Sequence, residues 1–389
     1  MKNVFLNWQL GTNFGWGILG LNLFCHWAND PDLRPLMGRP ITDSDIGQCD
    51  PLRVYRAFPA MDASNRFFST ITTTPDGRRT VNALLLDALG NGFPATHCYG
   101  SFNIGRCIFE NTGLAQAKSA LARYDALLVA SNWSADLLAD ATGRRPHVIF
   151  EGVDPSLFCP GPRSGLMDPD KFYVFSGGKV EFRKGQDLVL EAFRKFSATR
   201  SDCVLVTAWH SPWPQVSAGF RGRLPAALEI GANGMLDITG WAQRNGLKPQ
   251  SVIDIGFVPN VLMPSVLREM DVCLQPSRAE ACTNLPVKEA MACGIPVIAG
   301  LNTGMLDLLT DDNCIPLKKQ SPVTSANPGE TAGWGESDID EIVAALEFAY
   351  TARERARAIG LRARQWLIEH ERTWQAHARG LKSWILSLA

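Results

Sequence analysis

Short apolar runs alternate with stretches of helical periodicity along most of the chain, which has 389 residues. In its first part, the pattern predicts strands at residues 4–6, 106–109, 126–130 and 147–150, and helices at 18–28, 83–88, 116–123 and 134–141. Residues 31–66 are rich in Pro, Asp and Arg, and we expect loops there. Strands that alternate with helices predict an α/β fold built on doubly wound parallel sheets.

The same alternation resumes after residues 152–165, which are dense in Pro and Gly and predict a linker. The second part predicts strands at 172–175, 204–207, 251–255, 272–275 and 295–299, and helices at 187–196, 264–270, 338–352 and 354–370. Residues 374–388 carry apolar side chains at helical spacing and predict one last amphipathic helix. We therefore expect two α/β domains, residues 1–160 and 166–371, joined by a hinge.

Composition and charge restrict the class of protein. The chain is 46% hydrophobic and 20% charged, as expected for a soluble globular protein, and its net charge of −1 argues against nucleic acid as a partner. Its ten cysteines include no CxxC pair, which suits a reducing cytoplasm. Polar residues such as Asn7, Gln9 and Asn13 interrupt the first apolar stretch, so we expect neither a signal peptide nor a transmembrane segment.

Residues 276–299 are the most informative stretch of the chain. Asn284 and Leu285 lead into Pro286 at the expected first position of a helix, and Gly294 ends that helix before a buried strand. The free N–H groups at such a helix start form an anion site. Glu280 and Glu289 flank this site, and their carboxylates suit hydroxyl groups such as those of a ribose and a sugar.

A second motif follows the strand predicted at 172–175. Gly177 and Gly178 form a turn that lets backbone approach phosphate oxygens, and Lys179 and Lys184 can neutralise charge on a leaving diphosphate. Taken alone, this motif fits an ordinary turn with solvated lysines equally well. Its combination with the segment that contains Glu280 and Glu289 favours a diphosphate site, in which we expect Lys184 to be partly exposed.

These motifs resemble the retaining nucleotide-sugar glycosyltransferases of the GT-B fold, usually called glycosyltransferase family 4 or glycosyl transferases group 1. The resembling residues are Pro276-Ser277-Arg278, Glu280, Thr283-Asn284-Leu285-Pro286, Glu289-Ala290-Met291-Ala292-Cys293-Gly294 and Pro296-Val297-Ile298. Two departures are that eight residues, not seven, separate the glutamates, and that Lys179 replaces an Arg. The resemblance implies two Rossmann-like domains that face each other across a cleft, with residues 372–389 packing back on the first.

The resemblance also implies roles for individual residues. Lys179, Lys184 and Glu280 are the expected catalytic residues. The expected donor-binding residues are Gly15, Trp16, Gly17, Gly178, Thr283, Asn284, Leu285 and Glu289. His97, Glu110 and Asn111 are candidates for the acceptor or sugar side, since many family members carry a His where this chain has Glu110. Trp16 as core and His97 as a structural histidine remain alternative interpretations.

Two further patterns point elsewhere and are weaker. Gly11, Gly15 and Gly17 also fit the dinucleotide fingerprint of short-chain dehydrogenases, but no tyrosine has a Lys four residues later, as those enzymes require. Three Asp-x-Asp triplets, at 43–45, 168–170 and 338–340, are interpreted as structural, and we expect no metal and no cofactor. The aromatic run at 209–214 shapes a base or sugar pocket, or else packs in the core.

The motifs together with the resemblance thus imply a cytoplasmic retaining glycosyltransferase that moves a sugar from a nucleoside-diphosphate sugar to an acceptor hydroxyl. The acceptor is a glycan, a lipid or a protein, and association with a membrane surface stays open. An epimerase or hydrolase acting on sugar nucleotides is an alternative on the same fold. A nucleotide-sugar-binding module without activity is another.

Overall fold

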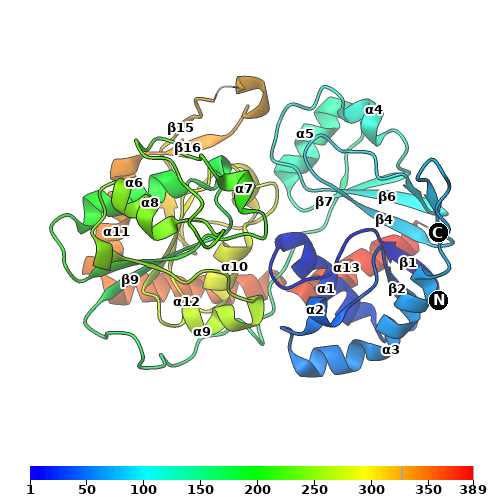
Figure 1. The fold of residues 1–389 in the computed structure, drawn as a ribbon, viewed down its shortest axis with the longest axis horizontal. Helices are drawn as coiled ribbons and strands as arrows, with labels where there is room; N and C mark the ends of the chain where they lie inside the picture. The colour runs from blue at the N-terminus through cyan, green and yellow to red at the C-terminus, as the bar shows by residue number, and fades with distance from the viewer. Residues whose placement is uncertain (326, 389) are drawn as a thin grey trace.

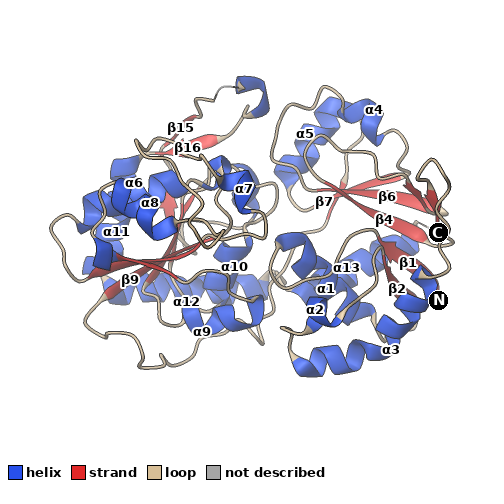
Figure 2. Cartoon of the chain, in the orientation of Figure 1, coloured by secondary structure: helices blue, strands red, loops and turns tan. Residues whose placement is uncertain are grey.

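The computed structural model describes residues 1–325 and 327–388, which form two α/β domains side by side (Figure 1). Helices cover both faces of a parallel sheet in each domain (Figure 2). In the described part of the chain, no helix combines the length and the apolar character needed to cross a membrane. All ten cysteines are free thiols.

The first domain contains a six-stranded sheet in which every strand pair is parallel. Its order is β2 (Leu33–Met37), β1 (Lys2–Leu6), β4 (Leu84–Leu89), β6 (Phe102–Cys107), β7 (Ala126–Val129) and β8 (His147–Val148). The helices are α1 (Gly15–Trp27), α2 (Asp43–Ile46), α3 (Pro51–Phe68), α4 (Ala117–Leu121) and α5 (Asn132–Thr142), and β3 (Arg79–Thr80) pairs with β5 (Cys98–Tyr99). The chain order reverses between β1 and β4, which are neighbours in the sheet.

Two predictions for the first domain were wrong. The helix predicted at 83–88 is instead strand β4, residues 84–89, because a short apolar run buried on both faces of a parallel sheet has no period that separates strand from helix. Residues 31–66 contain β2 and most of α3 rather than loops. Asp50 caps α3 by accepting hydrogen bonds from the backbone N–H of Leu52 and Arg53, and Pro35 is tolerated because β2 is an edge strand.

The second domain contains another six-stranded parallel sheet. Its order is β11 (Val252–Asp254), β10 (Cys203–Ala208), β9 (Phe172–Gly177), β12 (Val272–Gln275), β13 (Val297–Gly300) and β14 (Ile315–Leu317), the strand order of a dinucleotide-binding Rossmann domain. Its helices are α6 (Gln186–Ser197), α7 (Pro214–Ser217), α8 (Ile238–Arg244), α9 (Met263–Leu267), α10 (Leu285–Ala292), α11 (Ile339–Thr351) and α12 (Arg353–Glu369). A hairpin of β15 (Gln320–Pro322) and β16 (Gly335–Ser337) projects from this domain near the first one (Figure 1).

The chain crosses between the domains twice, and the two crossings pair with each other. The backbone N–H of Val153 donates to the carbonyl of Arg372 at 3.0 Å, and the N–H of Trp374 donates to the carbonyl of Val153 at 3.1 Å. Gly152 allows this approach, since a Cβ there would lie 2.0 Å from the carbonyl carbon of Thr373. The predicted linker is therefore half of a two-stranded connection.

The last helix, α13 (Trp374–Ser387), returns to the first domain and packs on α1 (Figure 1). The indole Nε1 of Trp27 donates to the carbonyl of Ala378 at 3.1 Å, and Leu381 and Ile385 are buried in the first domain's core. The chain therefore leaves the first domain at one crossing and returns to it at the other, so that both described ends of the chain lie on the first domain.

Candidate active site

A cavity of about 490 Å³ lies between the domains. It opens at the carboxyl ends of the strands where each sheet changes direction, β1 and β4 in one domain and β9 and β12 in the other. In open α/β sheets this is the place where ligands bind. The lining residues from the first domain are Thr12, Asn13, Phe14, Gly15, Trp16, Ile18, Gly90, Asn91, Ile108, Glu110 and Glu151.

The N-terminus of α10 forms part of the cavity wall. Asn284 caps this helix by accepting from the backbone N–H of Val287, and its side-chain Nδ2 donates to Glu280 Oε1 at 2.7 Å. Leu285 and Pro286 form the first turn and line the cavity, so Pro286 is the second helical residue rather than the predicted first. The positive end of the helix dipole and its free N–H groups favour an anion here.

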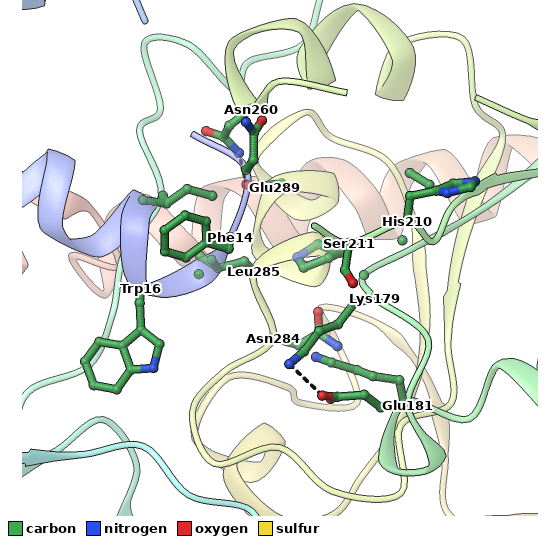
Figure 3. A pocket seen from close by; sticks show the side chains of 18 of the residues that line it. Phe14, Trp16, Lys179, Glu181, His210, Ser211, Asn260, Asn284, Leu285 and Glu289 are labelled. Carbon is green, nitrogen blue, oxygen red and sulfur yellow. Dashed lines mark hydrogen bonds and ion pairs between the residues drawn. The ribbon is translucent and has the colours of Figure 1, made fainter. Parts of the chain in front are cut away.

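Three basic side chains stand beside this helix start, and carboxylates pair with all of them. Figure 3 shows one of these pairs, Lys179 with Glu181. Lys184 Nζ lies 2.8 and 2.9 Å from the two oxygens of Glu280. Arg183 contacts Glu280 at 2.9 Å, Glu181 at 2.8 Å and, from the other domain, Glu110 at 3.1 Å. Lys179 contacts Glu181 at 2.6 Å. These cations can contact a diphosphate bound at the helix start.

Burial and charge act against each other in this network. Burial raises the pKa of Glu280, but Lys184 and Arg183 outweigh it and hold that pKa below its usual range. Burial lowers the pKa of Lys184, with Arg183 adding to the effect and Glu280 opposing it. The Glu280 carboxylate therefore remains ionised between its two basic partners.

The structure corrects the expectation that Lys184 is partly exposed. Its exposed fraction is 9%, because the side chain passes under the Gly178 turn to reach Glu280. Lys179 is the more exposed lysine, with a side-chain exposure of 45%. Arg183, adjacent to Lys184, was missed because the predicted motif was defined by the spacing of the two lysines alone.

Glu289 projects from α10 into the opposite end of the cavity. Asn260, which sequence reasoning also missed, donates its Nδ2 hydrogen to Glu289 Oε1 at 2.6 Å (Figure 3). The backbone N–H of Asn260 in turn donates to the carbonyl of Thr12 in the first domain at 3.2 Å. Burial raises the pKa of Glu289 to about 7, although the hydrogen bond from Asn260 and the charge of Lys288 oppose the rise. This carboxylate can accept hydrogen bonds from the hydroxyl groups of a ligand.

Aromatic residues form the wall opposite the basic cluster. Phe14 and Trp16 lie at the start of α1, across the cavity from Lys179 (Figure 3). Phe14 meets Trp213 of the other domain edge to face, with ring centroids 6.0 Å apart. Trp16 also packs against Trp8, at 5.5 Å, so it belongs to both the cavity and the core.

The aromatic run at 209–214 divides between the two predicted roles. Trp209 is fully buried in the core, and its Nε1 donates to Ser176. His210, Ser211, Pro212 and Trp213 line the cavity. His210 Nε2 lies 2.6 Å from Asp254 Oδ2, and this carboxylate fixes the orientation of the ring.

The structure brings most of the candidate residues together. Those that line the cavity are Lys179, Lys184, Glu280, Gly15, Trp16, Gly178, Asn284, Leu285, Glu289 and Glu110. Those that do not are Gly17, Thr283, His97 and Asn111. Gly17 packs against Gly11, and the side chain of Thr283 is buried. His97 is exposed on the connection between β4 and β5, and the side-chain oxygen of Asn111 accepts a hydrogen bond from the N–H of Gly113.

The Asp-x-Asp triplets have structural roles where their contacts are defined. Asp45 completes a capping box at α2, and Asp338 caps α11. Across residues 1–325 and 327–388, no group of three or more His, Cys, Asp or Glu side chains is placed to hold a metal ion.

Comparison with known proteins assigns the second domain. Residues 171–327, which include the basic cluster and α10, match the family model described as glycosyl transferases group 1. The chain carries a glycosyl transferases group 1 domain. This glycosyltransferase domain provides the basic side chains and the helix start of the cavity described above.

The curated relatives that match parts of the chain are distant. The chain is 23% identical over 288 residues to the GDP-mannose-dependent alpha-(1-6)-phosphatidylinositol monomannoside mannosyltransferase of Mycolicibacterium smegmatis, covering 68% of this chain and 64% of that protein. It therefore spans less than two thirds of this relative's length.

Solved structures support the fold over the full length. The sucrose-phosphate synthase of Thermosynechococcus elongatus matches with a TM-score of 0.67 at 17% identity, covering 100% of this chain and 99% of that one. HepE of Anabaena, solved with UDP-glucose, matches with a TM-score of 0.60 at 16% identity, covering 100% of both chains. The architecture is that of GT-B glycosyltransferases, two Rossmann-like domains across a cleft.

Proposed function

We propose that the protein is a retaining glycosyltransferase that moves a sugar from a nucleoside-diphosphate sugar to an acceptor hydroxyl. One observation carries the proposal. Lys179, Arg183 and Lys184 gather beside the N-terminus of α10, within a cavity bounded by both domains. A diphosphate is the leaving group that such a set of cations stabilises best, because it gains negative charge as the sugar bond breaks.

The other residues of the cavity fit the parts of this donor. Glu289, with Asn260, is placed to accept from ribose hydroxyls, and Glu280 lies beside the basic pair where the sugar follows the diphosphate. The basic cluster and the helix start supply the positive charge, so the proposed reaction needs no metal and no cofactor. The mycobacterial relative is named for GDP-mannose and the Anabaena neighbour was solved with UDP-glucose, which leaves base and sugar open.

The acceptor enters from the first domain in this proposal, and the leaving phosphate takes the acceptor's proton on the same face of the sugar. That geometry retains the anomeric configuration. The protein works in the cytoplasm, where nucleotide sugars are made and free thiols persist.

A panel of nucleotide sugars, each with and without candidate acceptors, tests this function. Acceptor-dependent release of the nucleoside diphosphate, with the product's anomeric configuration determined by NMR, is the expected result. Isomerisation or hydrolysis of the donor at the same rate with and without every acceptor would support an epimerase or a hydrolase instead.

A further inference from the structure

The basic side chains that line the cavity all come from the second domain. They are Lys179, Arg183 and Lys184, and among the described lining residues the charged groups of the first domain are Glu110 and Glu151 alone. Glu280 and Glu181 already pair with the three cations, and Glu110 adds a third carboxylate from across the cleft. The acceptor side of the cavity therefore offers a substrate anion no free positive charge.

Two further cations lie behind Glu151, outside the cavity. Arg106 Nη2 donates to Glu151 Oε1 at 3.2 Å, and Lys288 Nζ lies 3.8 Å from Glu151 Oε2. Both basic side chains are fully buried, and in the described structure Arg106 Nε and Nη1 and Lys288 Nζ have no hydrogen-bond partner. Glu151 lines the cavity and separates this buried pair of cations from it.

We propose that the acceptor is a carbohydrate hydroxyl without a neighbouring phosphate, and that Glu151 is an internal anion which keeps Arg106 and Lys288 from binding an acceptor phosphate. The proposal rests on the proposed function, because it concerns the acceptor of the same reaction. Glu151 fills the position in front of two unsatisfied cations, where a phosphate oxygen would otherwise be favoured.

Glu110 acts in the same direction once a donor is bound. A donor diphosphate attracts Arg183, and each contact that Arg183 makes to the diphosphate weakens its 3.1 Å contact with Glu110. Glu110 then faces the acceptor side as a carboxylate, next to a diphosphate that is itself negative. An acceptor phosphate meets repulsion from both groups, whereas an acceptor hydroxyl can donate a hydrogen bond to Glu110.

The aromatic wall supplies the attraction that an uncharged acceptor needs. Phe14 and Trp16 line the cavity on the first-domain side. The C–H face of a sugar ring is apolar and packs on aromatic rings, while its hydroxyl groups reach the polar rim. The two rings and the two carboxylates together suit an uncharged sugar ring.

Matched acceptors test the selectivity. Each is offered with and without phosphate, for example glucose against glucose 6-phosphate and inositol against D-inositol 3-phosphate, and acceptor-dependent release of the nucleoside diphosphate is measured. We expect kcat/KM to be at least about tenfold higher for the phosphate-free member. Glu110→Gln and Glu151→Gln should each narrow that ratio, while Asp62→Asn, an exposed carboxylate of α3, should leave it unchanged.

A phosphorylated member used as well as or better than its counterpart overturns the proposal. If no acceptor, with or without phosphate, raises the release of the nucleoside diphosphate above the rate without acceptor, the proposed function fails instead. The two failures are therefore distinguishable.

Inorganic phosphate gives a test that needs no acceptor. With the donor site filled by saturating UDP or GDP, phosphate should not raise the melting temperature of the wild type, but it should raise that of Glu151→Ala by binding Arg106 and Lys288. Equal stabilisation of both proteins, or of neither, contradicts the internal-anion role. If Glu151→Ala does not accumulate as folded protein, Glu151→Gln decides through its ratio of kcat/KM between phosphate-free and phosphorylated acceptors. A ratio equal to that of the wild type overturns the internal-anion role of Glu151.

Discussion

Lys184 and Glu280 form a buried ion pair, with Nζ 2.8 and 2.9 Å from the two carboxylate oxygens, at the point where the second sheet changes direction. Arg183 and Asn284 hold the same carboxylate at 2.9 and 2.7 Å. A cation that is buried and already paired is fixed in place before any substrate arrives. Such preorganisation is what makes an electrostatic contact effective when charge develops on a leaving group.

Lys184→Ala should therefore lower turnover by about a hundred- to a thousand-fold at saturating donor. Because the side chain is buried against Glu280, the free energy of unfolding should also fall, by about 1–3 kcal/mol, with Arg183 limiting the loss. Steady-state kinetics and urea unfolding measure the two effects separately. Lys195→Ala, which removes an exposed lysine paired with Asp340 on the same domain, is the control. Near-normal turnover of Lys184→Ala would place the diphosphate elsewhere.

Glu289 should make donor binding depend on pH. Its pKa is raised to about 7 by burial, so the carboxylate is protonated below that pH and accepts hydrogen bonds from a ribose less well. The KM for the donor should fall as pH rises from 6 to 8, because a nucleotide sugar has no terminal phosphate that titrates in this range. Glu289→Gln should raise KM and abolish this dependence while changing kcat little. A pH dependence of KM that persists in Glu289→Gln would assign it to another group.

The same shift has a consequence for stability. In the unfolded chain Glu289 has its ordinary pKa of 4.5, so between pH 4.5 and 7 the folded state holds a proton that the unfolded state has lost. The free energy of unfolding should therefore fall as pH rises through this window and should level off above pH 7. Urea unfolding of the wild type and of Glu289→Gln, compared at pH 5 and pH 8, isolates the contribution of this residue. The difference between the two proteins should change with pH, and an unchanged difference would mean that burial does not perturb Glu289.

The sequence predicted the elements whose local signals are strong. Helix α10 begins near Pro286 and ends before Gly294, which has a φ of 74°, because proline and glycine act on backbone geometry whatever surrounds them. Strand β4 was missed since its apolar run is buried on both faces, and burial depends on neighbours that are distant in sequence.

In the candidate site too, residues in local motifs were predicted and residues that depend on distant partners were not. Lys184 and Glu280 could each be selected from a local motif, but nothing in the sequence shows that they pair, since they are 96 positions apart in the sequence. Asn260 and Glu151 were missed because neither stands in a motif, and each becomes significant only through partners on other elements. Sequence motifs therefore predict some components of the site, and the tertiary fold determines the others and the charge balance.

Arg278 connects the projecting hairpin to the segment that carries the basic cluster, and we expect this link to contribute strongly to the stability of the second domain. Its fully buried guanidinium donates to both oxygens of Asp187, at 2.8 and 2.7 Å, to Glu336 of β16 at 2.6 Å and to the carbonyl of Phe182 at 2.6 Å. Arg278→Lys cannot reproduce this planar set of donors. We expect a loss of about 3–5 kcal/mol in the free energy of unfolding. Arg357→Lys, on the same domain in α12 with a side-chain exposure of 61%, should cost little. A loss for Arg278→Lys no larger than for this control would contradict the linking role.

The two domains should open about the paired crossings at Val153 and Thr373. Polar contacts hold the cleft edges together, among them Asn132, whose backbone N–H and Nδ2 each donate to Asp307 at 2.7 Å. Such contacts compete with water, so donor-free protein should sample open forms, and a donor bound by both domains should close them.

Small-angle X-ray scattering should therefore show a smaller radius of gyration with a nucleotide sugar than without it. Asp307→Ala removes the Asn132 contacts and should enlarge the donor-free form further, because two of the hydrogen bonds between the domains are lost while those from Ser131 and Ser134 to the carbonyl of Ala281 remain. Asp311→Ala, four residues away in the same segment and paired with Lys318 of its own domain, should scatter like the wild type. If the scattering curves with and without the nucleotide sugar are superimposable for the wild type and also for Asp307→Ala, the crossings do not act as a hinge.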